Sequence, residues 1–310
     1  MIETRTPPFG RLATAMVTPF DENSKIDFKA VDRVVDHLLR TGTETLVVNG
    51  TTGENPTLED DERKELLVRV RERVGNKAKV VMGTGTNSTA KSIKAGEQAE
   101  KLGADGLLVV VPYYNKPSPA GLHAHFSAVA LATSLPIIIY NIPGRTGVNL
   151  PVDTTLELIE QHPNIHALKD STGSTEQTAE IAAKARSDFR IYSGDDHLLL
   201  PFLSVGACGI VSVASHVVGT QIAKIMTEYF AGNTENARKM FYANLPLFRA
   251  LFMAPNPTCV KYALSKIGLC RPTLRLPLVE LNTVQHNVLD AVLSDYTLDD
   301  VQIRKEAVTS

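Results

Sequence analysis

The sequence has few cysteines, little net charge and no long hydrophobic run, and each absence excludes a class of protein. Its 310 residues include three cysteines and no CxxC pair, so neither a disulfide framework nor a zinc site is expected. The formal net charge of −2 provides no strong field to recruit nucleic acid or an anionic membrane. No apolar run is long enough to cross a bilayer, and the polar residues 1–10 lack the apolar region of a signal peptide. We therefore expect a cytoplasmic protein without nucleic-acid or membrane partners.

What the chain does contain is a series of short β-rich runs. Several are continuously apolar, such as GLLVVV at 106–111, and lack the alternation of a half-exposed strand. Continuous runs are typical of parallel strands covered by helices on both faces. The predicted strands lie at residues 12–18, 45–49, 79–83, 106–111, 136–140, 165–169, 189–193 and 209–213.

Helix-like segments separate these runs. The segment 28–40 carries one apolar stripe and follows Asp27, a suitable N-cap. Eight strand–helix alternations with right-handed crossovers favour an α/β fold, a closed (β/α)8 TIM barrel. A doubly wound open sheet is the alternative, although no GxGxxG fingerprint follows the first run. The predicted helices lie at residues 28–40, 57–74, 87–102, 120–132, 151–161, 174–185 and 196–205.

The alternation stops after Gly232. Three further helices are predicted at 236–252, 257–267 and 279–293, with no strand between them. We therefore expect a catalytic barrel domain at 1–232 and a helical appendage at 233–310. The charged end of the chain, residues 297–310, is expected to be partly mobile.

One stretch stands out chemically, the sixth run and its turn, IHALKDSTG at 165–173. Lys169 ends an apolar run and precedes turn-forming residues, so it lies at the tip of a buried strand. A lysine at the edge of an apolar layer loses hydration, which disfavours its ammonium form. The neutral amine can form a Schiff base with a ketone. The simpler interpretation, a surface lysine at a strand end, remains open on this stretch alone.

Other polar side chains follow the neighbouring runs. In a (β/α)8 barrel the active site lies at the C-terminal ends of the strands, so these side chains share one rim with Lys169. The rim candidates are Thr51, Thr52, Tyr114, Tyr140, Arg145, Asp195, Asp196 and Ser212.

Each candidate also has an ordinary structural explanation. Tyr140 fits a core tyrosine, Thr51 and Thr52 fit turn formers, and Arg145 fits a surface arginine. Asp195 and Asp196 are expected to cap the following helix. The pair His123 and His125 is two residues apart on a predicted helix, so the two rings do not share a face and no metal site is expected. The joint placement of the rim residues, rather than any one of them, favours an active site.

Together these motifs resemble those of the dihydrodipicolinate synthases, within the pyruvate-dependent class I aldolases related to N-acetylneuraminate lyase. The similarity extends from about Leu12 into the helical appendage. The arginine of YNIPGRTG favours the synthases over the lyases. The matching segments are GTTGE at 50–54, YYN at 113–115, YNIPGRTG at 140–147, LKDSTG at 168–173, SGDD at 193–196, and Asn256-Pro257 followed by Val260-Lys261.

The resemblance implies a role for each rim residue. Lys169 would form the Schiff base with pyruvate, and Thr52 with nearby backbone amides would hold the pyruvate carboxylate. Tyr140 would exchange protons at the imine, through Thr51, with Tyr114 of a neighbouring subunit. Arg145 would bind the carboxylate of L-aspartate 4-semialdehyde, a planar acceptor that suits a guanidinium group. The backbone at Gly194 and Val211 would shape the pyruvate pocket.

The reaction implied is condensation of pyruvate with L-aspartate 4-semialdehyde to 4-hydroxy-tetrahydrodipicolinate, a step of lysine and diaminopimelate biosynthesis. No metal or organic cofactor is expected, because the protonated imine is itself the electron sink. A homotetramer, as a dimer of dimers, is usual in the family. Two alternatives remain open: another pyruvate-dependent class I aldolase acting on a sugar acid or hydroxy-oxo-acid, and a non-catalytic binding protein with the same fold.

One departure from the family bears on regulation. Lysine-inhibited members place a histidine and an acid around the allosteric cleft, where this chain has Arg63 and Lys91, with Pro56 and Asp60 nearby. Two cations would repel the ammonium group of lysine. We therefore expect weak or absent inhibition by L-lysine.

Overall fold

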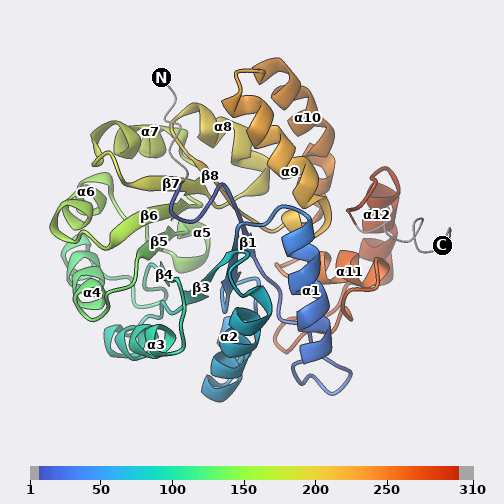
Figure 1. Ribbon diagram of the computed structural model, residues 1–310, viewed down its shortest axis with the longest axis horizontal. Coiled ribbons are helices and arrows are strands. Elements are labelled where there is room, and N and C mark those ends of the chain that lie inside the picture. Colours follow the sequence, from blue (N-terminus) through green and yellow to red (C-terminus); the bar gives the residue numbers. More distant parts are fainter. Residues whose placement is uncertain (1–6, 300–310) are drawn as a thin grey trace.

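The computed structural model describes residues 7–299, which form a closed barrel of eight parallel strands in chain order (Figure 1). Each strand pairs with the next, and the eighth pairs with the first through Leu12 and Ile210, so the sheet has no edge. The predicted barrel is therefore confirmed. The strands are β1 (Leu12–Ala15), β2 (Thr45–Val48), β3 (Lys79–Gly83), β4 (Gly106–Val110), β5 (Ile137–Asn141), β6 (Ile165–Asp170), β7 (Arg190–Ser193) and β8 (Gly209–Ser212).

The largest difference from the predicted strands is at the end of β1, which was expected to reach Thr18 but ends at Ala15. Side chains replace the strand ladder there. The amide of Val17 donates to His216 Nε2 at 3.2 Å, and the hydroxyl of Thr18 donates to the carbonyl of Gly53 at 2.7 Å. The polar end of β1 is thus tied to the turns after β2 and β8.

Helices surround the strands. The first has the predicted bounds, and the carboxylate of its N-cap, Asp27, accepts from the amide of Ala30 at 3.0 Å. Those of the barrel layer are α1 (Phe28–Arg40), η1 (Asn55–Thr57), α2 (Asp60–Val74), α3 (Thr89–Lys101), α4 (Pro119–Leu131), α5 (Pro143–Thr146), α6 (Val152–Gln161), α7 (Thr175–Lys184), η2 (Asp196–Leu198), α8 (Leu199–Ser204) and α9 (Ser215–Phe230).

The sequence does not predict α9 or the single-turn helix α5. No capping side chain marks the start of α9, its first turns are buried, and its backbone kinks at Val218, so its beginning shows no amphipathic period. The predicted helix 57–74 begins only at Asp60, because Glu59 and Glu62 form a capping box there. The predicted helix 196–205 is divided into η2 and α8.

Three more helices, α10 (Thr234–Ala250), α11 (Thr258–Lys266) and α12 (Thr283–Ser294), follow the barrel as predicted. They lie beside α9 and α1, on one side of the ring (Figure 1). Their apolar residues, such as Phe248 and Leu264, belong to the same buried cluster as Ile222 of α9. The division at residue 232 stays a prediction, and most of the predicted mobile end lies outside the described residues. No helix in the described range is both long and apolar enough to cross a membrane.

A second, smaller cluster fills the barrel itself. It is formed by inward-facing residues that alternate with outward-facing ones along each strand. Its buried members are Phe9, Ala13, Ala15, Val47, Val81, Leu108, Ile138, Tyr140, Ala167, Tyr192 and Val211. This apolar cluster fills the barrel interior directly below the polar residues at the C-terminal ends of the strands.

Candidate active site

Lys169 and Tyr140 lie side by side on β6 and β5, at the C-terminal end of the barrel. They are register partners, and the Lys169 Nζ atom lies 4.1 Å from the centroid of the Tyr140 ring. Both residues are 5% exposed. Lys169 is the penultimate residue of β6 rather than its tip, so strand geometry aims its side chain into the barrel. A buried amine beside a phenol is the arrangement that Schiff-base chemistry needs.

The strand end that carries Lys169 is fixed by its neighbour. Asp170, fully buried, accepts from the amide of Thr172 at 2.8 Å and from the hydroxyl of Thr178 at 2.7 Å. The amide of Gly194 donates to the carbonyl of Asp170 at 2.8 Å. A Cβ atom at Gly194 would lie 1.9 Å from Ser171 Oγ and 3.1 Å from the Asp170 carbonyl oxygen, so a larger residue there would displace the Ser171 side chain.

The turn after β2 places Thr51 and Thr52 at the same rim. Within this turn the amides of Gly53 and Glu54 donate to the carbonyls of Gly50 and Thr51, at 3.1 and 3.0 Å. The amides of Thr51 and Thr52 donate to no acceptor within residues 7–299. Two unused amides beside a hydroxyl are the elements of a carboxylate site.

The same turn is held from outside the barrel, by residues whose roles the sequence does not predict. Glu54, 3% exposed, accepts from Lys261 Nζ at 2.5 Å and from the amide of Arg275 at 3.0 Å. The Thr52 hydroxyl accepts from Asn256 Nδ2 at 2.9 Å. A signal for Lys261 exists in the sequence: it shares a helix face with the apolar Leu264, three residues on, where a lysine is buried only if it is paired.

The prediction that Asp195 and Asp196 cap the following helix is wrong. Asp195 makes no capping hydrogen bond. Asp196, 1% exposed, instead accepts from the Ser212 hydroxyl at 2.5 Å and from the amides of Val213 and Ala214 at 3.1 and 3.0 Å, so it secures the end of β8. Burial raises the pKa of Asp195, and the positive charge of Lys169 opposes this rise. A carboxyl group thus lies within electrostatic reach of Lys169.

Tyr114 and Arg145 differ from the other candidates because they are exposed. Tyr114 is 88% exposed and has a positive φ of 71°, in the loop between β4 and α4. Arg145 lies on α5, and its guanidinium group has no ion-pair or hydrogen-bond partner among the described residues. Val211, by contrast, is buried in the barrel interior, beside Ala13 of β1. The structure therefore places Tyr114 and Arg145 at the rim without fixing them within one chain.

Burial makes the cysteines poor candidates for a nucleophile. All three cysteines are free thiols, and burial raises the pKa of Cys208 and of Cys270 to about 12. Neither residue presents a thiolate near neutral pH. No group of three His, Cys, Asp or Glu side chains within residues 7–299 is placed to hold a metal ion.

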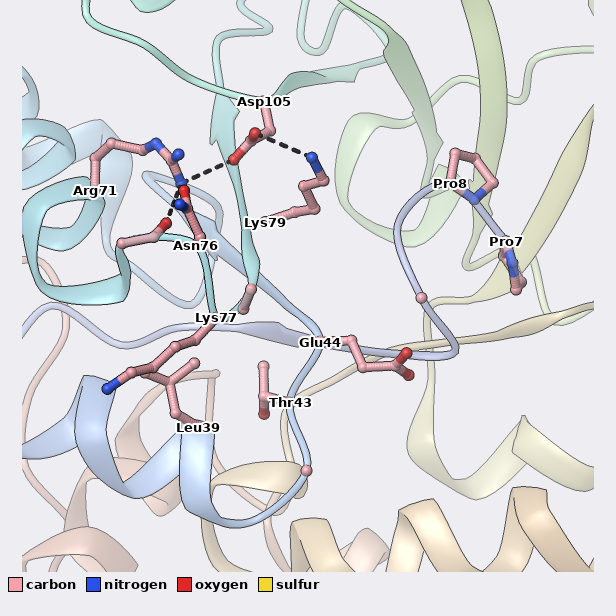
Figure 2. A pocket seen from close by; sticks show the side chains of 14 residues that line it. Pro7, Pro8, Leu39, Thr43, Glu44, Arg71, Asn76, Lys77, Lys79 and Asp105 are labelled. Carbon is pink, nitrogen blue, oxygen red and sulfur yellow. Dashed lines mark hydrogen bonds and ion pairs between the residues drawn. The ribbon is translucent and has the colours of Figure 1, made fainter.

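A surface pocket of about 740 Å³ lies at the opposite end of the barrel (Figure 2). Asp105 is its central charge, and its carboxylate lies 3.2 Å from the Arg71 guanidinium and 3.4 Å from Lys79 Nζ. Glu44 accepts from the amides of Arg11 and Leu12, at 2.7 and 3.1 Å. Arg71 and Lys79 thus neutralise Asp105, and Glu44 satisfies two amides at the start of β1. This pocket, at the N-terminal ends of β2 and β3, contains none of the predicted site residues.

Comparison with known proteins agrees with this geometry. The model of the Dihydrodipicolinate synthetase family matches residues 8–296. The chain is 46% identical to 4-hydroxy-tetrahydrodipicolinate synthase 1 of Halalkalibacterium halodurans, over 92% of this chain and 96% of that protein. The crystal structure of dihydrodipicolinate synthase from Bacillus anthracis superposes with a TM-score of 0.91 at 43% identity, covering 96% of this chain and 100% of that one. The synthase of Cyanidioschyzon merolae, solved with lysine bound, gives a TM-score of 0.91 at 42% identity, over 94% and 99% of the two chains.

Proposed function

The chain belongs to the dihydrodipicolinate synthetase family, and on that premise we propose which of its residues carry out the reaction. The enzyme is a lyase that condenses pyruvate with L-aspartate 4-semialdehyde to 4-hydroxy-tetrahydrodipicolinate, in lysine and diaminopimelate biosynthesis. The observation that supports our assignment most strongly is the buried Lys169 amine, 4.1 Å from the Tyr140 ring centroid, at the C-terminal end of the barrel.

Lys169 provides the covalent step. Its neutral amine attacks the ketone carbon of pyruvate, water leaves, and a protonated imine forms. Loss of a proton from the methyl group gives an enamine, whose carbon attacks the aldehyde of the second substrate. The product's own amine then displaces Lys169 as the ring closes, which regenerates the free lysine. Each step requires a proton to be added or removed beside Tyr140.

The remaining residues bind and exchange protons. Thr52 and the unused amides of Thr51 and Thr52 hold the pyruvate carboxylate, while Gly194 and Val211 limit the space around it. Tyr140 transfers protons through Thr51 to Tyr114 of the partner subunit. Arg145 binds the carboxylate of the semialdehyde through two parallel hydrogen bonds.

The test separates the covalent step from the choice of aldehyde. Incubation with pyruvate and borohydride, followed by peptide mass spectrometry, should place a reduced adduct on Lys169 in the unaltered enzyme and in Lys79→Met, and none in Lys169→Met. Arg145→Ala should keep the adduct but raise the KM for the semialdehyde about 10- to 100-fold, because a charged hydrogen-bond pair is lost. An unmodified Lys169 peptide in the unaltered enzyme would refute the assignment.

We also propose the assembly and location. The assembly is a homotetramer, built as a dimer of dimers, and the exposed Tyr114 supports the one interface in which a partner subunit covers that side chain. Sedimentation of the full chain measures this directly. Three free cysteines support a location in the reducing cytoplasm.

We further propose that L-lysine inhibits this enzyme weakly or not at all. The Arg63 guanidinium donates to the Asp60 carboxylate at 2.7 Å and to the Asn55 carbonyl at 3.0 Å, so these acceptors are already used. Lys91 is exposed and adds a second positive charge. Steady-state rates should therefore be unchanged by submillimolar L-lysine, and clear inhibition in that range would contradict the proposal.

A further inference from the structure

The Thr52 hydroxyl is held by a residue that lies far from it in sequence. Asn256 precedes α11, and its Nδ2 atom donates to Thr52 Oγ1 at 2.9 Å. Both side chains are buried, at 7% and 2% exposure. Because Asn256 and Thr52 are 204 residues apart in the sequence, their contact depends on the docking of the C-terminal helices against the rim of the barrel.

The direction of this hydrogen bond decides what the hydroxyl can do. A threonine hydroxyl has one proton and two lone pairs. Because Asn256 donates, it occupies a lone pair and leaves the proton for another acceptor. No residue within 7–299 accepts that proton. The hydroxyl is therefore set as a donor, beside the unused amides of Thr51 and Thr52.

The turn that carries this hydroxyl is also braced at its other end. The buried pair of Glu54 and Lys261 joins it to α11, two residues beyond Thr52. Two contacts from the same C-terminal segment thus fix the turn's position and the hydroxyl's direction separately. The ion pair positions the backbone, whereas only Asn256 touches the hydroxyl.

We propose that Asn256 is a positioning residue for pyruvate binding: it orients the Thr52 hydroxyl so that its proton points to the substrate carboxylate. This inference rests on the proposed function, in which Thr52 binds that carboxylate. It assigns to the helical appendage a direct part in substrate recognition. An aspartate at position 256 would reverse the hydrogen bond, because a carboxylate only accepts, and would withdraw the proton from the substrate.

The test measures the pyruvate concentration that gives half-maximal borohydride-trapped adduct on Lys169, together with KM and kcat. Asn256→Asp should raise the half-saturating concentration about 10- to 100-fold, since a charged hydrogen bond is lost and a negative charge is added. The adduct at saturating pyruvate should remain. Asn256→Ala should raise the same concentration about fivefold, because the hydroxyl then rotates freely. An unchanged value in either variant would overturn the proposal.

Two comparisons separate positioning from a structural effect. Asn244→Asp is the matched control, because Asn244 is also buried in the appendage but donates to the Met240 carbonyl, away from the site. It should leave pyruvate binding unchanged. In a Thr52→Val background Asn256→Ala has no hydroxyl to release and adds no charge, so the double variant should match Thr52→Val. Additive losses would show that Asn256 acts independently of Thr52. Absence of any adduct in the unaltered enzyme would instead refute the proposed function.

Discussion

The two halves of the candidate site are built in opposite ways. The half that we propose to bind pyruvate consists of Lys169, Tyr140 and Thr52, at 5%, 5% and 2% exposure. The half that we propose to serve the second substrate contains Tyr114, at 88% exposure, and Arg145, whose guanidinium group has no partner within residues 7–299. We call these the buried half and the exposed half. The buried half is assembled from side chains of a single chain, whereas the exposed half lies at the surface, on the loop after β4 and on helix α5.

This difference matches the demands of the two steps. Imine formation needs a nucleophile of reduced hydration and a donor set fixed in advance, and burial supplies both. The second substrate must enter after pyruvate is bound, and protons must be exchanged with solvent, so the groups that serve these tasks stay accessible. Substitutions that disturb the fold should therefore impair the buried half. Substitutions that disturb subunit assembly should impair the exposed half.

The strongest expected effect comes from the ion pair that braces the buried half. Lys261→Met leaves the Glu54 carboxylate buried without its partner and should lower the free energy of unfolding by about 3–5 kcal/mol. Chemical denaturation measures this loss. The double change of Lys261→Met with Glu54→Gln should recover part of it, because no unpaired charge remains.

Lys266→Met provides the matched control for this prediction. Lys266 lies on the same helix and pairs with Asp290, but these side chains are 46% and 40% exposed. An exposed pair contributes about 0–1 kcal/mol, so this variant should remain close to the unaltered protein. Equal losses in the two variants would show that helix α11, rather than the buried pair, determines stability.

The second prediction concerns His216, which ties the end of β8 to β1 under the buried half. Its Nε2 atom accepts from the Val17 amide and its Nδ1 donates to the Val213 carbonyl at 2.8 Å, so the ring is neutral. Burial lowers the pKa of His216 from 6.5 to about 4. The unfolded chain thus binds a proton below pH 6.5 that the folded protein does not bind until about pH 4. Stability is full above pH 6.5 and decreases as the pH falls.

The shifted pKa of His216 should lower the free energy of unfolding by about 2 kcal/mol when the pH falls from 7 to 5. His216→Gln should be less stable at pH 7 but should lose less stability on acidification. Comparing the two pH dependences cancels the contributions of other groups. Parallel curves would show that the pKa of His216 is the same in the folded and the unfolded chain, so that burial does not lower it.

Much of this architecture can be predicted from the sequence, because the signals are local. The apolar runs identify every strand of the barrel, and Lys169, Tyr140 and Thr52 are visible as polar residues at strand ends. Their register could not be predicted, because a shift between Ile137 and Ile138 moves the β5–β6 pairing by one residue and so places Lys169 opposite Tyr140. A helix without a cap or a clear period, such as α9, has no comparable local signal.

The contacts that brace the site could not be predicted, because they join distant segments. The sequence predicts that Asp196 caps a helix, but its carboxylate instead accepts from the amides of Val213 and Ala214 after β8. Asn256 and Lys261 match a family motif, yet their partners at Thr52 and Glu54 are more than 200 residues away. Only the folded chain shows which buried polar groups satisfy one another.

The last prediction tests the exposed half. Tyr114→Phe should lower kcat about 10- to 100-fold, because a proton-relay hydroxyl is lost, and should leave the Lys169 adduct intact. Tyr242→Phe is the control, since Tyr242 is also exposed but lies on α10. Mixing Tyr114→Phe with the inactive Lys169→Met under subunit exchange should restore activity. Each hybrid dimer then contains one site with its own Lys169 and Tyr114 of the partner subunit. If mixing restores nothing although hybrids form, the relay is contained within one chain, and the two halves differ only in exposure.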